Sequence, residues 1–139
     1  MAANIEDDEI EELLDEDTLT RLRAEHPGAH WTVANTCRGR EAVVFRRLTR
    51  EEFKRAQSML DDKARAKGVG ERVFRDVLVY PPPKSPAFEQ LFNDCPAIDE
   101  QVSTLALEIA RGKAPEEAKK LVPSSAKPRA ATPPSTPAA

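Results

Sequence analysis

The sequence has few aromatic residues, few cysteines and no long apolar run. Aromatics make up 5% of its 139 residues and charged residues 32%, which is typical of a small, mostly helical domain rather than of a large-cored enzyme. Cys37 and Cys95 are far apart and form no CxxC pair, so we expect reduced, structural thiols. No apolar run approaches the ~18 residues of a membrane span, and the start lacks the features of a secretion signal. The sequence therefore predicts a cytoplasmic protein that does not bind membranes.

The chain also lacks the short motifs of common catalytic and nucleotide-binding sites. It contains no GxxxxGK[ST], GxGxxG or GxSxG, and no acid lies in an apolar context that would raise its pKa for acid–base catalysis. His26 and His30 are four residues apart, but Pro27 and Gly28 disfavour the helix that would place both imidazoles on one face. We therefore predict that the protein is not an enzyme and has no cofactor or metal site.

A strong asymmetry of charge is present instead. Nine acids and no base lie between Glu6 and Asp17, so the remainder of the chain carries 21 bases against 15 acids, although the net charge is -3. Four apolar residues of this stretch are spaced like one face of a helix: Ile5, Ile10, Leu13 and Leu14. We interpret residues 1–17 as an acidic flexible arm that can fold on contact. It is either a solvated arm or one that masks a basic surface of the protein or docks on a basic partner.

A β-hairpin is predicted from about Trp31 to Arg46. Trp31-Thr32-Val33 alternates apolar and polar residues, Ala42–Phe45 is a second strand-like run, and Gly39 can adopt the positive φ of a hairpin loop. An isolated hairpin is marginal in water, so it must pack on helices or on another chain.

Four helices are predicted after the hairpin. Thr49 and Glu52 match a capping box, which predicts a helix to about Asp62 with Phe53, Ala56 and Leu60 on one side. The other three are indicated by their apolar faces, caps and prolines. The first has Val73, Phe74, Val77 and Leu78 on its apolar face and is ended by Tyr80-Pro81-Pro82-Pro83. The second is a short helix capped by Ser85, with Phe88, Leu91 and Phe92 as its apolar face. The third runs from Pro96 to Gly112.

The predicted fold class is mainly α with a small β-hairpin. We expect a compact helical domain over residues 18–112, flanked by the acidic arm and by a helical remnant with a Pro/Ala-rich disordered tail over residues 113–139. From Val122 onward the chain is too poor in apolar residues to offset the entropy of ordering it. Deleting this tail is expected to leave stability nearly unchanged.

Two further patterns have competing interpretations. The stretch from Arg38 to Lys67 has ten bases and five acids, and this excess of bases makes nucleic-acid binding one interpretation. Interleaved Glu51 and Glu52, and the lack of an aromatic-rich strand, favour a solvated mixed-charge helix. The run from Tyr80 to Pro83 is either a polyproline ligand for an aromatic groove or, as we favour, a rigid spacer between helices.

Three segments together resemble a known family. "VVFRRLTREEFKRAQSML", the apolar helix ending in "VLVYPP", and "FEQLFNDCPAIDEQVSTLALEIARG" resemble the small tail assembly chaperone-like proteins of long-tailed phages and prophages. The resemblance covers roughly Val43 to Gly112, and none of its motifs is catalytic. The triple proline, the acidic arm and the Pro/Ala-rich tail depart from the family pattern. These departures leave open whether the chain serves a phage, a domesticated prophage or a tail-like injection particle.

The resemblance implies a non-enzymatic role in the host cell cytoplasm. Such proteins hold the tape-measure protein soluble while tail tube subunits polymerise around it, so the implied partners are the tape-measure protein and the tail tube protein. The competing functions are a tail completion or adaptor component retained in the particle, and a small nucleic-acid-binding regulator. Candidate partner-binding residues are the larger apolar and aromatic side chains of the helices: Phe53, Tyr80, Phe88, Leu91 and Phe92.

Overall fold

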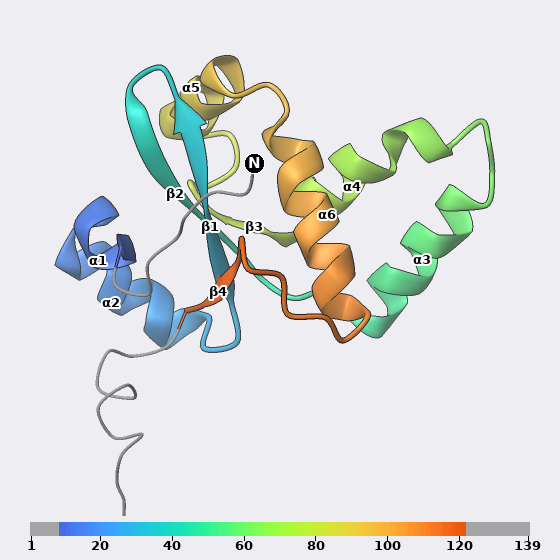
Figure 1. The fold of residues 1–139 in the computed structure, drawn as a ribbon, viewed down its shortest axis with the longest axis horizontal. Coiled ribbons are helices and arrows are strands. Elements are labelled where there is room, and N and C mark those ends of the chain that lie inside the picture. Colours follow the sequence, from blue (N-terminus) through green and yellow to red (C-terminus); the bar gives the residue numbers. More distant parts are fainter. Residues whose placement is uncertain (1–8, 122–139) are drawn as a thin grey trace, which may run out of the picture.

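A computed structural model describes residues 9–121, which form an antiparallel sheet covered by helices on both faces (Figure 1). The helical elements are α1 (Glu9–Leu13), α2 (Glu16–Glu25), α3 (Arg50–Leu60), the 3-10 turn η1 (Ala66–Gly68), α4 (Val69–Val77), α5 (Pro86–Asp94) and α6 (Ile98–Ala110). The strands are β1 (His30–Thr36), β2 (Gly39–Phe45), β3 (Leu78–Tyr80) and β4 (Lys119–Lys120), in the sheet order β3-β2-β1-β4.

Each face of the sheet has its own apolar core. Val43 and Phe45 of β2 pack with the helices of the larger core, which includes Phe74 of α4. Ala42 and Val44 point to the opposite face and pack with α1 and α2. This division follows from the alternation of side chains along a strand, which sends successive residues to opposite faces. We call the two clusters the α4–α6 core and the α1–α2 core.

The architecture is a mixed α/β sandwich rather than the predicted mainly helical domain with one hairpin. The hairpin itself is confirmed: β1 and β2 pair from His30–Phe45 to Thr36–Gly39, and Gly39 has a φ of +117° in the turn. It is extended at both edges, by β3 beside Val44 and by β4 beside Trp31. The two added strands supply the pairing that a lone hairpin lacks.

Strand β3 corrects one of the predicted helices. Leu78 continues the apolar pattern of α4, which led us to place it on that helix. The helix instead ends at Val77, and Leu78 adopts an extended conformation (φ -64°, ψ 130°). Pairing with Val44 and Phe45 accounts for the change, because Pro81 bars the helix from continuing and the open edge of β2 offers hydrogen bonds.

Three other helix boundaries follow their predicted signals, whereas α6 begins at Ile98 rather than at the predicted Pro96. Thr49 and Glu52 form a complete capping box, with the Glu52 N–H 3.1 Å from Thr49 Oγ1 and the Thr49 N–H 2.9 Å from Glu52 Oε1. The Ser85 hydroxyl accepts from the Phe88 N–H at 3.1 Å at the start of α5. Gly112, with a φ of +88°, follows the end of α6.

The acidic arm also differs from its prediction. Its residues from Glu9 onward form α1 and the start of α2, and Ile10 and Leu14 are only 2% and 7% exposed in the α1–α2 core. Their i, i+4 spacing places both on one side of the chain, and they cover Ala42 and Val44. Burial of these side chains offsets the repulsion among the acids, most of which are exposed, whereas Glu9 pairs with Arg40. Residues 1–8 lie outside the described part.

The predicted domain end at residue 112 is also too early. β4 pairs with β1, the Leu121 N–H donates to the Ala29 carbonyl at 2.8 Å, and Leu121 is 1% exposed. The Thr32 hydroxyl donates to the Glu117 carbonyl at 2.7 Å. The segment up to Leu121 therefore belongs to the folded unit. The predicted disordered tail from Val122 onward lies outside the described residues.

Glu52 ties α3 to the sheet as well as capping the helix. Its two carboxylate oxygens accept from the Arg46 guanidinium at 2.8 and 2.7 Å, and Arg46 also donates to the Asp76 carbonyl. The hydrogen bonds from Arg46, together with those from Thr49, lower the pKa of Glu52 from 4.5 to about 2. Since the ionised form is the one stabilised in the fold, this contribution is present above about pH 5 and is lost as the pH falls toward 2.

We expect Glu52→Gln to lower the free energy of unfolding by about 1–2 kcal/mol at neutral pH. The full pKa shift corresponds to roughly 3.4 kcal/mol, but the Arg46 side chain is 35% exposed and solvent screens the pair. Urea denaturation of both proteins at about pH 7 and about pH 3 measures the effect. The difference in free energy of unfolding between the wild type and Glu52→Gln should be less than half as large at about pH 3 as at about pH 7. A gap that is the same at both pH values would contradict this role of Glu52.

Candidate functional site

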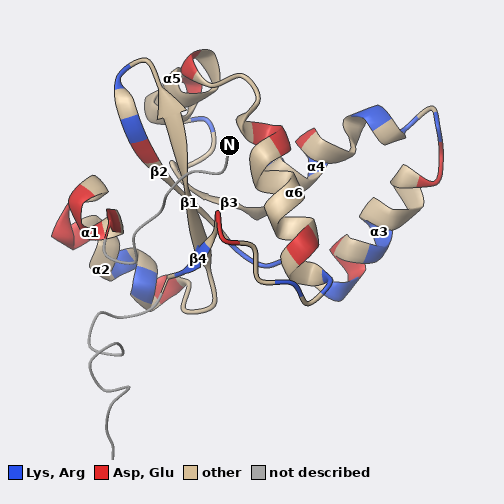
Figure 2. Ribbon diagram, viewed as in Figure 1, with Lys and Arg blue, Asp and Glu red and all other residues tan. Residues whose placement is uncertain are grey.

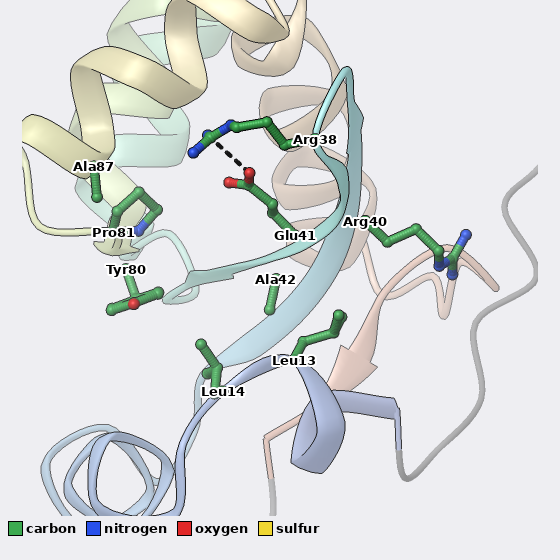
Figure 3. A pocket seen from close by; sticks show the side chains of 9 residues that line it. All are labelled: Leu13, Leu14, Arg38, Arg40, Glu41, Ala42, Tyr80, Pro81 and Ala87. Carbon is green, nitrogen blue, oxygen red and sulfur yellow. Dashed lines mark ion pairs between the residues drawn. The ribbon is translucent and has the colours of Figure 1, made fainter.

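An open cleft of about 230 Å³ lies beside the hairpin, between α1, β2, the end of β3 and α5 (Figure 3). Its lining combines apolar and charged side chains: Leu13, Leu14, Arg38, Arg40, Glu41, Ala42, Tyr80, Pro81 and Ala87. β3 pairs with β2 at Val44 and Phe45, and β2 continues past it along the cleft to Gly39. The cleft is therefore the space that β3 leaves where Pro81 turns the chain away from the sheet.

The apolar part of the lining comes from three separate segments. Leu13 ends α1 and Leu14 follows it, Tyr80 ends β3 and Pro81 follows it, and Ala87 is an exposed residue in the first turn of α5. Tyr80 is partly buried against the α1–α2 core. This combination of aliphatic contacts with one phenol suits a partner's side chain, since tyrosine offers both apolar area and a hydrogen bond.

Charged side chains of the hairpin form the other part of the lining. Arg38 forms ion pairs with Glu41 at 2.8 Å and with Asp94 at 2.9 Å, which links the hairpin turn to α5. The Arg40 side chain points away from the middle of the cleft in Figure 3, and it donates to Glu9 at 2.9 Å. The hydrogen bonds to Glu9 hold the pKa of Arg40 above its ordinary value. These pairs fix the hairpin relative to α1 and α5, so the lining is preorganised.

The five predicted partner-binding residues do not form one surface. Tyr80 alone of them lines the cleft. Phe88 and Leu91 are buried in the α4–α6 core, and Phe92 packs partly buried against it. The rings of Phe88 and Phe92 lie 5.3 Å apart, and each also contacts Phe74. These three side chains of α5 therefore hold that helix on the domain.

Phe53 occupies a different part of the molecule. It is partly exposed on α3, and the Arg111 guanidinium lies 5.8 Å from its ring centre. α3 packs on α4, away from the cleft. Sequence reasoning missed Leu13, Leu14 and Ala87 as site residues, because nothing in the local pattern indicates that α1 and α5 meet beside β2.

The histidines and cysteines are dispersed over the fold. His26 follows the end of α2, whereas His30 begins β1 and stacks on Phe45 with ring centres 6.0 Å apart. Burial, followed by the charges of Arg47 and Lys120, lowers the pKa of His30. Within residues 9–121 no three or more His, Cys, Asp or Glu side chains are grouped so as to hold a metal ion. Cys37 and Cys95 are free thiols.

Two general properties complete the description. None of the helices within the described range has both the length and the apolar character needed to cross a bilayer. Comparisons with protein-family models, with curated proteins and with solved structures find no match for this chain.

Proposed function

We propose that the protein is a non-enzymatic, tail assembly chaperone-like protein that acts in the host cell cytoplasm. Its partner is the tape-measure protein, the tail tube protein or both, during assembly of a phage tail or tail-like particle. The proposal rests on the resemblance of the segment from Val43 to Gly112 to this family. The cleft beside β2 is the observation in the fold that supports it best.

The cleft suits a segment of polypeptide better than a small substrate. It is open, and apolar side chains of Leu13, Tyr80 and Ala87 stand beside the charged Arg38 and Glu41. Protein interfaces commonly combine an aromatic residue and an arginine with a polar rim. β2 runs along the cleft, so a partner segment in an extended conformation would lie next to a strand that can hydrogen-bond with it.

We expect Ala87→Trp to weaken binding of a tape-measure fragment by tenfold or more, about 1.4 kcal/mol. The indole would fill the cleft from the first turn of α5. Because position 87 is exposed, the substitution should change the stability of the fold little. Gln90→Trp is the matched control, because Gln90 is exposed on the same helix and does not line the cleft. Calorimetric titration of each protein with the fragment measures the effect. Equal affinities for the two variants would rule out the cleft as the binding site.

A retained tail component would also bind other tail proteins, so binding alone does not separate it from a chaperone. Mass spectrometry of purified particles does, because an assembly chaperone is absent from the finished particle. Stoichiometric recovery of the chain in particles would favour the completion or adaptor role instead.

A further inference from the structure

Helix α3 exposes one large apolar side chain, that of Leu60. Ala56 is buried, Met59 packs partly buried against the α4–α6 core, Phe53 is partly exposed beside Arg111, and Leu60 is 41% exposed. The helix lies at the outer end of the α4–α6 side, on the far side of α4 and α6 from the sheet (Figure 1). Leu60 is the one large apolar side chain within residues 9–121 that is exposed.

Exposed basic side chains lie on α3 and in the segment that follows it. Lys54 and Arg55 are exposed on α3, and further exposed bases follow in the segment that leads to α4: Lys63, Arg65 and Lys67. None of these five cations forms an ion pair within the part of the chain that the structure describes, whereas Arg72 and Arg75 of α4 pair with acids of their own helix. We call Phe53, Leu60 and the five cations the α3 surface.

The opposite end of the molecule carries the complementary charge. α1 and α2 begin with exposed acids, among them Glu12 and Glu16 (Figure 2). α1 and α2 cover one face of the sheet, and α3 lies beyond the helices that cover the other face. The acidic and basic ends of one molecule are therefore separated by the whole sheet and cannot neutralise each other.

We propose that the α3 surface binds the acidic α1–α2 end of a second copy of this chain. The contact is heterologous, joining different surfaces of the two molecules, so it adds copies head to tail. Charge complementarity within one sequence identifies the occupant. A nucleic acid is less well matched, since Leu60 offers an apolar contact that a phosphate backbone does not use.

Two neutralising variants test the proposal, each removing one side of the contact. Lys54→Gln with Arg55→Gln alters the α3 surface, and Glu12→Gln with Glu16→Gln alters the acidic end. All four side chains are exposed, so the fold should be retained, which circular dichroism checks. Arg72→Gln with Arg75→Gln is the control, because it removes two cations of α4 outside the α3 surface.

Sedimentation velocity of the full chain gives the result. At about 0.1 mM protein and about 50 mM salt, the wild type and the control should have average masses above one chain, falling toward one chain at about 500 mM salt. Each neutralised variant alone should stay at one chain. Their equimolar mixture should form pairs and nothing larger, because each variant retains one working surface.

Three outcomes would overturn the proposal. They are a wild type that remains a single chain at low salt, neutralised variants that associate like the wild type, and a mixture that forms no pairs. Salt-dependent binding of a DNA duplex that is lost in the Lys54→Gln, Arg55→Gln variant, with no self-association of the wild type, would assign the α3 surface to nucleic acid and also overturn it.

Discussion

Replacing Phe74 with alanine is expected to lower the free energy of unfolding by about 3–5 kcal/mol. Phe74 is 0% exposed and lies in the α4–α6 core. Its ring centre is 6.1 Å from that of Phe88 and 5.5 Å from that of Phe92, so its loss leaves a cavity under α5 and removes two aromatic contacts. Urea denaturation followed by circular dichroism measures the change.

Phe53→Ala provides the matched control for this substitution. It removes a ring of the same size, but from a partly exposed position whose ring contact is with Arg111. The expected loss is below about 1 kcal/mol. Similar losses for both variants would contradict the assignment of Phe74 to the core and Phe53 to the surface.

A chain that ends at Gly112 is expected to be less stable than one that ends at Leu121, by about 3–5 kcal/mol. The shorter chain loses Leu121, which is fully buried against the α1–α2 core, and with it the backbone bond to Ala29. It also loses the Glu117 carbonyl that accepts from the buried Thr32 hydroxyl, which would leave that donor without its partner. Thermal melting compares the two chains.

The full chain serves as the reference for this truncation. Ending the chain at Leu121 should leave its melting temperature nearly unchanged, because the sequence from Val122 onward has no apolar face to contribute. If the chain ending at Gly112 had the same melting temperature as the full chain, β4 and Leu121 would not contribute to stability. The folded unit would then end where the sequence pattern suggested.

Local chemistry made several elements predictable from the sequence. The capping box of Thr49 and Glu52 depends on residues three apart, the start of α5 on Ser85 and Pro86, and the end of α6 on Gly112. The hairpin was likewise evident from two strand-like runs around Gly39. In each case the residues that determine the element lie within a few positions of it.

The elements that were missed depend on partners far along the chain. β3 exists because Leu78 and Tyr80 pair with β2, and two lysines form β4 because β1 offers an edge. The apolar spacing of Ile10 and Leu14 was visible, but the density of acids around them suggested a flexible arm. Only the packing of these two side chains over β2 shows that the arm belongs to the core.

The candidate site was the least predictable feature. Its lining comes from α1, the hairpin, the end of β3 and α5, and Tyr80 was the one residue among them that the sequence indicated. Phe88, Leu91 and Phe92 were reasonable candidates because their helix is short and apolar. A helix of this length is stable when that face is buried, and the domain itself buries most of it.

The most direct test of the proposed function is the solubility of the tape-measure protein of the same genome during co-expression. The fraction that stays in the supernatant after centrifugation is compared for cells that also express the wild-type chain, Ala87→Trp or Gln90→Trp. We predict that the wild type and Gln90→Trp keep most of the tape-measure protein soluble, and that Ala87→Trp does not. A tape-measure protein that is equally insoluble with and without the wild-type chain would contradict the chaperone function.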